Sequence, residues 1–231
     1  EIKKRLGLFE HRTVPLDNVM QTVGTRRWQR AAEDIAVRSL TLVRDTAGTV
    51  AALRARRTRL ALVTYADEAT PSVALHLAEL LRVNGDTVDY FRLWPMSGPA
   101  SYDSARQVLA RAPVAVFATN VKPIAGRGSI ALPESLAALI TTTDSLKPTA
   151  LVSFGSPYLL NQTPTVRSYL TAWSGVRVAE RAAARALLGL SPIRGHLPIR
   201  IPPGYPVGWG IVMPDSTPPP PTPPAVPRML P

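Results

Sequence analysis

The stretch TALVSFGSPYLL, Thr149 to Leu160, decides the fold. Its first half is an unbroken apolar run, which is typical of a strand covered on both faces, as in a parallel sheet. The Gly-Ser-Pro turn that follows interrupts this run. We therefore expect a buried strand that ends at Gly155, with Phe154 in the core and Tyr158 delivered to the surface.

Three earlier segments have the same character, namely Arg59–Ala66, Thr87–Leu93 and Pro113–Asn120. A segment with helical spacing separates each of them from the next strand. Strands that alternate with helices at this interval indicate βαβ units, whose right-handed crossovers build a doubly wound sheet. The predicted fold class is α/β, with a mostly parallel, flavodoxin-like sheet sandwiched between helices.

Capping and stop signals delimit the expected helices. The expected helices are Arg26–Leu42 with Thr25 as N-cap, a helix from Thr70-Pro71 to about Arg82 ended by Asn84-Gly85, Ser101–Ala110 capped by Ser101, Pro133–Thr141, and Arg177–Leu188 stopped by Gly189. One face of the first helix would carry Ala31, Ile35, Ser39 and Leu42, with Ala32, Ala36 and Val43 beside it. The alternative is that Ser39–Val43 is already extended. Tyr169–Trp173 is a candidate for another short strand.

The two ends of the chain differ from its middle. Glu1–Leu8 has the pattern of the end of a helix that Gly7 stops, and His11–Val23 that of an irregular connector. Ser191–Ile211 alternates turn and apolar residues, so we expect it to wrap the edge of the sheet. Nine of the 24 prolines lie from Pro214 onward. We expect a stub and connector over 1–25, an α/β domain over 26–213 and a disordered, proline-rich tail over 214–231.

Composition narrows the classes of function. No run of about 18 apolar residues exists, so no membrane span is expected. The absence of cysteine excludes disulfides and thiolate chemistry. The chain starts at Glu1 with neither an initiator Met nor a signal peptide, and we expect it to be a piece of a longer protein. The net charge of +11 raises the question of nucleic acid. The one dense cluster, Arg54–Arg59, lacks interleaved aromatic residues, so we expect a solvated basic face and no nucleic-acid partner.

The residues that could be catalytic are better explained by structural roles than by catalysis. Ser156 lacks the G-x-S-x-G context of a nucleophile elbow, and Pro157 after it has no N–H to stabilise an oxyanion. Asp67 and Glu68 are adjacent in sequence, and Asp67 is well placed to organise the turn before the next helix. We therefore predict no catalytic residue in this chain.

Neither a metal nor a cofactor is expected. His11, His76 and His196 are far apart, and none has a second ligand at helical spacing. The loop at 126–128, Gly-Arg-Gly, has no phosphate-binding motif around it and is expected to be a mobile surface loop. Ligands of doubly wound sheets bind at the carboxyl ends of the strands. The residues near these ends that we expect to contact a substrate or another domain are Asp67, Asn120, Lys122, Ser156 and Tyr158.

Four blocks of sequence, in the same order, carry a resemblance to a known family. They are RLGLFEHR (5–12), AEDIAVRSLTLVRD (32–45), SFGSPYLL (153–160) and AARALLGLSPIRGHLPIRIP (183–202). Together they resemble the carboxyl-terminal half of glycoside hydrolase family 3, nearest to its bacterial β-N-acetylhexosaminidase branch. The resemblance covers roughly residues 1–211 and leaves out the proline-rich tail.

The resemblance implies an amino-terminal TIM-like barrel that precedes this α/β sandwich domain. Glu1–Leu8 would then be the last helix of the barrel, and Leu6 and Leu8 would be exposed in this chain. The nucleophilic aspartate, and in this branch a histidine acid/base, would lie on the barrel. Other branches take a glutamate acid/base from the second domain, but neither Glu68 nor Glu134 matches it.

The expected function is that of an accessory domain of a retaining exo-glycosidase that acts on N-acetylglucosamine-containing glycans, such as cell-wall fragments. Its expected partners are the barrel of the same parent chain and, through the parent, the carbohydrate. Cell-wall chemistry would place the parent in the periplasm or outside the cell. Two alternatives remain open. One is a free-standing α/β module that binds a sugar or a protein, and the other is a basic nucleic-acid binder.

Overall fold

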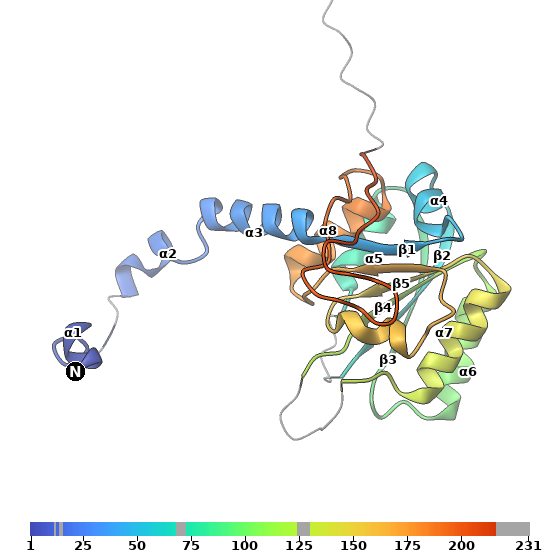
Figure 1. The fold of residues 1–231 in the computed structure, drawn as a ribbon, viewed down its shortest axis with the longest axis horizontal. Helices are drawn as coiled ribbons and strands as arrows, with labels where there is room; N and C mark the ends of the chain where they lie inside the picture. Colours follow the sequence, from blue (N-terminus) through green and yellow to red (C-terminus); the bar gives the residue numbers. More distant parts are fainter. Residues whose placement is uncertain (12, 14–15, 68–72, 124–129, 216–231) are drawn as a thin grey trace, which may run out of the picture.

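Six strands form a single sheet in the order β1-β6-β5-β4-β2-β3 (Figure 1). The computed structural model describes residues 1–11, 13, 16–67, 73–123 and 130–215. Neighbouring strands are parallel except for β1 and β6, which are antiparallel. The predicted α/β fold with a mostly parallel sheet is confirmed. The strands are β1 (Thr41–Asp45), β2 (Arg59–Ala66), β3 (Thr87–Leu93), β4 (Val114–Asn120), β5 (Thr149–Ser153) and β6 (Ser168–Thr171).

The strand that decides the fold lies in the middle of the sheet. All five residues of β5 are buried, with Ala150 and Val152 in the apolar core on one face and Leu151 in the core on the other. The strand ends at Ser153, two residues before the predicted end at Gly155. Phe154 is only 1% exposed, and its N–H still donates to the carbonyl of Thr119 (2.7 Å). The core position predicted for Phe154 is confirmed.

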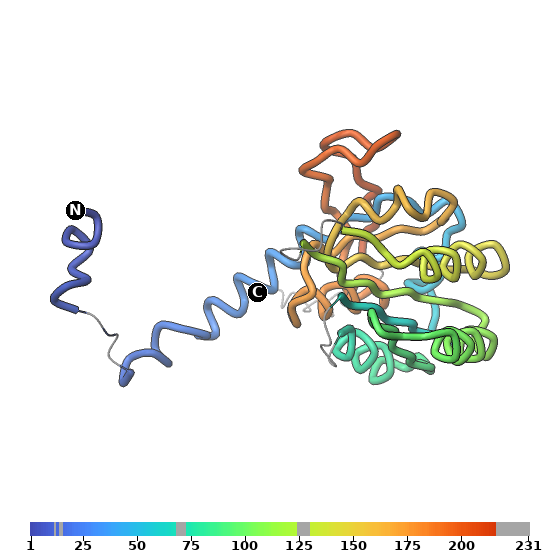
Figure 2. The backbone as a smooth tube through the Cα atoms, turned by 90° about the horizontal axis from the view of Figure 1, so that it is seen from below, coloured from blue at the N-terminus to red at the C-terminus, as the bar shows by residue number. Residues whose placement is uncertain are grey.

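Helices cover both faces of the sheet (Figure 1). Side chains of α4, α5 and α8 join one core, and those of α6 and α7 join the other. Helix α3 packs on α8, while α1 and α2 lie apart from the sheet (Figure 2). The helices are α1 (Ile2–Arg5), α2 (Val19–Thr22), α3 (Arg26–Ser39), α4 (Thr49–Ala55), α5 (Leu75–Val83), α6 (Pro99–Ala110), α7 (Glu134–Leu146) and α8 (Arg177–Leu187), with 3₁₀ turns η1 (Leu16–Asn18) and η2 (Pro157–Asn161).

Helix α3 begins as predicted and ends earlier. The Thr25 side chain accepts from the N–H of Trp28 and caps the helix. The helix stops at Ser39, because the following residues form the buried strand β1. The helical end at Leu42 is therefore wrong, and the alternative of an extended segment is confirmed for residues 41–43. Ile35 of the predicted face is 65% exposed, whereas Ala36, predicted beside that face, is buried.

Other helix boundaries differ in part from the prediction. Gly98, not Ser101, is the N-cap of α6, with Pro99 at its first position. Helix α7 continues to Leu146, because its buried face extends past Thr141 to Thr143 and Asp144. Helix α4 was not predicted. The stops at Asn84-Gly85 and Gly189 are confirmed, with Gly85 and Gly189 at positive φ. The predicted start at Thr70-Pro71 lies outside the described residues.

The arginine cluster is a solvated face only in part, since Arg56 and Arg59 are exposed as predicted whereas Arg54 and Arg57 are not. Arg54 is 5% exposed, and its guanidinium donates to the carbonyls of Ala186, Ser191 (3.1 Å) and Pro214. Arg57 donates to the carbonyl of Leu188 (2.9 Å). These cations bind carbonyls at and just after the end of α8, where the helix dipole is negative. Burial lowers the pKa of Arg54, and the charge of Asp215 opposes that shift.

The segment after α8 wraps the β1 edge of the sheet, as predicted. Ile211 pairs with Leu42 of β1, and Ile193 pairs with Met213. The indole Nε1 of Trp209 donates to the carbonyl of Val43 (2.8 Å). The described chain is therefore tied to the domain as far as Pro214, whose carbonyl binds Arg54. Residues 216–231 of the expected tail lie outside the described residues.

Helices α1, α2 and α3 form an arm with α1 at its far end (Figures 1 and 2). The carboxyl-terminal part of the arm contacts the body of the domain, because α3 packs on α8. The predicted exposure of Leu6 and Leu8 is confirmed, at 65% and 48%. The expected connector is partly helical, since η1 and α2 lie within it. The arm carries further exposed apolar side chains. These are Ile2, Phe9, Leu16, Met20, Val23, Trp28 and Ile35. Across the described ranges, no helix has both the length and the apolar character to cross a membrane.

Candidate functional site

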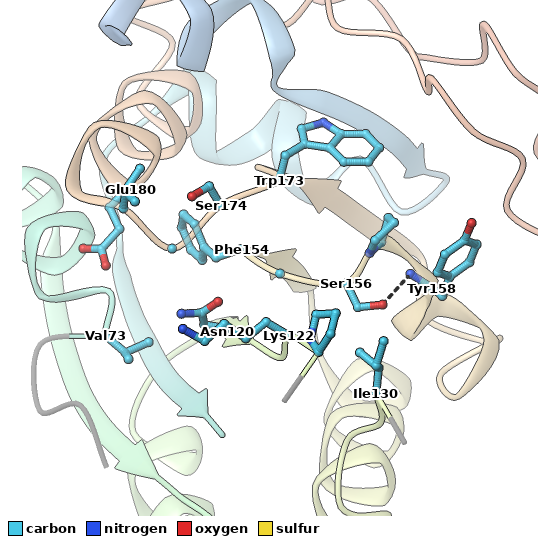
Figure 3. A pocket seen from close by; sticks show the side chains of 15 residues that line it. Val73, Asn120, Lys122, Ile130, Phe154, Ser156, Tyr158, Trp173, Ser174 and Glu180 are labelled. Carbon is cyan, nitrogen blue, oxygen red and sulfur yellow. Dashed lines mark hydrogen bonds between the residues drawn. The ribbon is translucent and has the colours of Figure 1, made fainter. Parts of the chain in front are cut away.

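A pocket of about 520 Å³ lies at the carboxyl ends of β4, β5 and β6 (Figure 3). Its walls come from the turn after β4, the Phe154–Tyr158 loop, the loop after β6 and the start of α8. Strand β2 has β3 on one side and β4 on the other, so the direction of the crossovers reverses there. The pocket is therefore close to the position at which doubly wound α/β proteins bind their ligands.

Four of the five predicted site residues line this pocket: Asn120, Lys122, Ser156 and Tyr158. The fifth, Asp67, lies beside it. One carboxylate oxygen of Asp67 accepts from the backbone N–H of Lys122 (3.3 Å), and the other accepts from the hydroxyl of Tyr65 (3.3 Å). The structure thus brings these residues together, with Asp67 holding the β4 turn. Glu68 and the loop at 126–128 lie outside the described residues.

Two glycines allow the strand-end loops to approach closely. A Cβ at Gly155 would lie 2.0 Å from the carbonyl oxygen of Val121, and a Cβ at Gly175 would lie 2.3 Å from Nδ2 of Asn120. The N–H of Ser156 donates to that same Val121 carbonyl (2.6 Å). The wall of the pocket therefore depends at Gly155 on a backbone contact that no larger residue permits, and at Gly175 on a close contact with the Asn120 side chain.

Ser156 has a structural role. Its side chain is 7% exposed, and its Oγ accepts from the N–H of Tyr158 (3.3 Å), which caps η2 (Figure 3). The hydroxyl of Ser153 donates to the carbonyl of Ser156 (2.7 Å). These bonds fix the turn and leave Tyr158 44% exposed at the rim, where its ring is open to a ligand or to another domain.

Trp173 is a pocket residue that the sequence did not single out. It follows β6 with φ +65°, a backbone conformation that is costly for a residue with a side chain. Its indole Nε1 donates to the carbonyl of Ser39 (2.8 Å) and lies 3.3 Å from Oγ1 of Thr41. Trp173 therefore joins the pocket wall to the end of α3, where the arm leaves the domain.

Glu180 is the second residue that was missed. It is 4% exposed, and its two carboxylate oxygens accept from the N–H groups of Ala74 (2.8 Å) and His76 (3.1 Å). Burial raises the pKa of Glu180, and the backbone amides and His76 oppose that shift. The sequence did contain a sign that Glu180 is buried. It lies three residues before Ala183 and seven before Leu187, which are both buried, so it falls in the apolar stripe of α8.

The pocket has the chemistry of a binding site. Phe154, Trp173 and Tyr158 supply aromatic surface, and Asn120 and Ser174 supply hydrogen-bonding groups. Among the described lining residues, Glu180 is the one carboxylate, and both of its oxygens are engaged with backbone amides. In the part of the chain that the structure describes, no three His, Cys, Asp or Glu side chains are grouped to hold a metal.

Comparisons with known proteins found similarity in structure. No protein-family model and no curated protein matches the chain. A β-glucoside phosphorylase, BglX, bound to 2FGlc superposes with a TM-score of 0.67 at 26% identity, over 84% of this chain and 35% of that one. A glycoside hydrolase family 3 β-N-acetylglucosaminidase from Paenibacillus sp. str. FPU-7 gives 0.66 at 19% identity, over 84% and 36%. A β-glucosidase from Listeria innocua gives 0.65 at 18% identity, over 91% and 37%.

The chain thus carries an α/β domain like that of glycoside hydrolase family 3 proteins. It spans about a third of the length of the solved chains that it matches, so those chains contain other parts as well. The matches include a phosphorylase, a glucosidase and an N-acetylglucosaminidase with nearly equal TM-scores. The similarity therefore supports the family-like domain and does not distinguish between its branches.

Proposed function

We propose that this chain is the carboxyl-terminal accessory domain of a retaining exo-glycosidase that hydrolyses N-acetylglucosamine-containing glycans. The observation that carries the proposal is the match itself, which takes in 84% of this chain and about a third of each carbohydrate-active chain. The preference for N-acetylglucosamine comes from the four sequence blocks and is supported by one of the matched structures.

The arm supports the existence of a partner domain on the pocket side. It leaves the body at Ser39, which Trp173 binds from the pocket wall. Its apolar side chains, such as Leu16 and Met20 (each 82% exposed), are exposed repeatedly along its length, and a partner commonly covers such side chains. We propose that an amino-terminal TIM-like barrel of the same protein covers the arm and faces the pocket.

The chemistry of glycoside cleavage assigns different roles to the barrel and to this domain. A retaining glycosidase needs two catalytic groups about 5–5.5 Å apart, one to form the glycosyl-enzyme and one to protonate the leaving oxygen. The described pocket lining supplies a single carboxylate, and its oxygens are occupied. In the proposed protein the barrel supplies both groups, and Asn120 and Tyr158 contact the glycan or the barrel. The parent would act on cell-wall fragments in the periplasm or outside the cell.

Two experiments test this proposal. Sequencing the coding region upstream of Glu1 should reveal a barrel domain with an aspartate nucleophile, and an unrelated domain there would contradict the proposal. The purified chain alone should not hydrolyse an aryl N-acetyl-β-glucosaminide or an aryl β-glucoside. Turnover that disappears in Asp67→Asn or Glu68→Gln would mean that this domain has catalytic carboxylates of its own.

The second candidate is a free-standing module that binds a sugar or a protein. It is favoured by the fact that the described walls of the pocket come from this domain without a contribution from the arm. Calorimetric titration of N-acetylglucosamine into the chain separates the two candidates. Saturable binding that Tyr158→Ala abolishes would support the module. No binding, together with a barrel upstream, would support the accessory domain.

A further inference from the structure

The amino end of α5 lies beside the pocket. Val73, just before the helix, lines the pocket, and the helix runs from Leu75 to Val83. The first N–H groups of a helix have no partner within it, and the helix dipole is positive at this end. In doubly wound folds such a helix end at the carboxyl edge of the sheet commonly holds the phosphate of a ligand.

In this chain the position is already filled by Glu180. The side chain comes from α8, 106 residues after Ala74, and its carboxylate is directed toward the Val73 side of the pocket (Figure 3). Each carboxylate oxygen accepts from one amide, at 2.8 Å from Ala74 and 3.1 Å from His76. The charge is buried, so water does little to screen it.

The described residues at the start of α5 supply no side-chain acceptor in place of this carboxylate. The N-cap position of α5 is Ala74, which has φ +55° and no side-chain acceptor for the helix amides. A Ser, Thr or Asp at that position would have capped the helix from within. The acceptor instead comes from another helix, at a position whose burial disfavours a charge.

We propose that Glu180 acts as a built-in anion that determines the specificity of the pocket, reserving it for uncharged ligands. A phosphate or sugar phosphate would find the α5 amides occupied and would meet a like charge in a medium of low dielectric. This inference rests on the proposed function in one respect, which is that the glycan meets the domain at this pocket. If the inference holds, the ligands of the pocket are neutral carbohydrates.

The test removes the Glu180 carboxylate and supplies a free carboxylate from solution. Glu180→Ala should lower the melting temperature, and about 100 mM acetate should restore about 3–5 °C of it by entering the vacated position. Acetamide, which has the same shape and no charge, should restore less than a third of that. Neither compound should shift the wild type comparably, because the position is then filled by Glu180. Equal rescue by acetate and acetamide, or no rescue, would overturn the proposal.

A second titration is independent of whether Glu180→Ala folds. Inorganic phosphate should bind Glu180→Gln at least about ten-fold more tightly than it binds the wild type, since the like charge has been removed. Equal affinities would overturn the proposal. Lys122 also lines the pocket, so the titration is repeated with Lys122→Gln. Saturable binding by the wild type that Lys122→Gln abolishes would likewise overturn it, because the pocket would then accept anions.

These measurements use no glycan and no turnover. The proposed glycosidase role can therefore fail while Glu180 still excludes anions, and the exclusion of anions can fail while the glycosidase role holds.

Discussion

The indole Nε1 of Trp173 donates to the backbone carbonyl of Ser39 at 2.8 Å. Trp173 is a wall of the pocket, and Ser39 is the last residue of α3. This hydrogen bond connects the candidate binding surface to the helix that carries the arm, in addition to the packing of α3 on α8. The position of α3 and the shape of the pocket depend on each other through both contacts.

Trp173→Phe should lower the free energy of unfolding by about 1 kcal/mol, because the ring is kept and one hydrogen bond is lost. Urea unfolding measures this change. The matched control is Trp28→Phe on the exposed side of α3, where Trp28 is 55% exposed and the change should be near zero. Equal losses of unfolding free energy in the two variants would show that the hydrogen bond to Ser39 does not stabilise the domain.

Phe154→Ala and Tyr158→Ala should differ sharply. Phe154 is 1% exposed, so its truncation should cost about 3–5 kcal/mol of stability. Tyr158 is 44% exposed, and its truncation should cost less than about 1 kcal/mol while weakening contact with a ligand or a partner domain. Chemical denaturation of both variants checks the prediction, which similar losses would contradict.

Arg54→Met should destabilise the domain by about 2–3 kcal/mol. The substitution keeps much of the buried volume and leaves the carbonyls of Ala186, Ser191 and Pro214 without their donor. Arg56→Met, two residues away on an exposed side chain, is the control and should change little. If both variants are as stable as the wild type, Arg54 does not hold the end of α8 in place.

Truncation after Asp215 should leave the melting temperature nearly unchanged. The proline-rich tail has too few clustered apolar groups to offset the entropy lost on ordering. The cut belongs after Asp215 and not after Met213, because the Pro214 carbonyl binds Arg54. Differential scanning calorimetry compares the two chains, and a loss of several degrees would show that the tail packs on the domain.

The raised pKa of Glu180 predicts a pH dependence of stability. The folded state holds the Glu180 proton to a higher pH than the unfolded state, so this residue's contribution falls as the pH rises above about 4.3. The decline ends once the raised folded pKa is passed. The difference in unfolding free energy between wild type and Glu180→Gln should follow that decline. A difference that stays constant with pH would contradict the shift.

The sequence predicted two strands to the residue, one inside the sheet and one at its edge. Strands β2 and β3 have the predicted bounds, although β3 is an edge strand in which only Val88 and Leu93 are buried. The fully buried β5 was predicted two residues too long. Helix α4 was missed because its N-cap residue is Gly48, at φ +65°. The side chain that accepts from the Val50 and Ala51 N–H groups is Asp45, three residues before the N-cap. The burial of Arg54 could not be predicted either, since arginine is almost never buried alone and its acceptors lie more than 130 residues away.

The site residues that were predicted are those that can be identified from the nearby sequence alone. Asn120 and Lys122 end or follow a strand, and side chains at the carboxyl edge of a parallel sheet converge. Trp173 and Glu180 have roles that depend on partners far along the chain, at Ser39 and at Ala74. A charged residue within the apolar stripe of a helix was the one available sign, and it pointed to Glu180.

The antiparallel edge of the sheet sets an order for folding during synthesis. Strand β1 is the first of the six strands to leave the ribosome, yet the Trp209 side chain that binds Val43 comes 166 residues later. At a translation rate of 5–20 residues per second, that interval lasts roughly 10–30 s. Strand β6 is made earlier and pairs with one edge of β1, but the other edge of β1 keeps unpaired backbone groups that can join to another strand. The nascent chain is therefore prone to misassociation at this edge until Trp209 and Ile211 have been made.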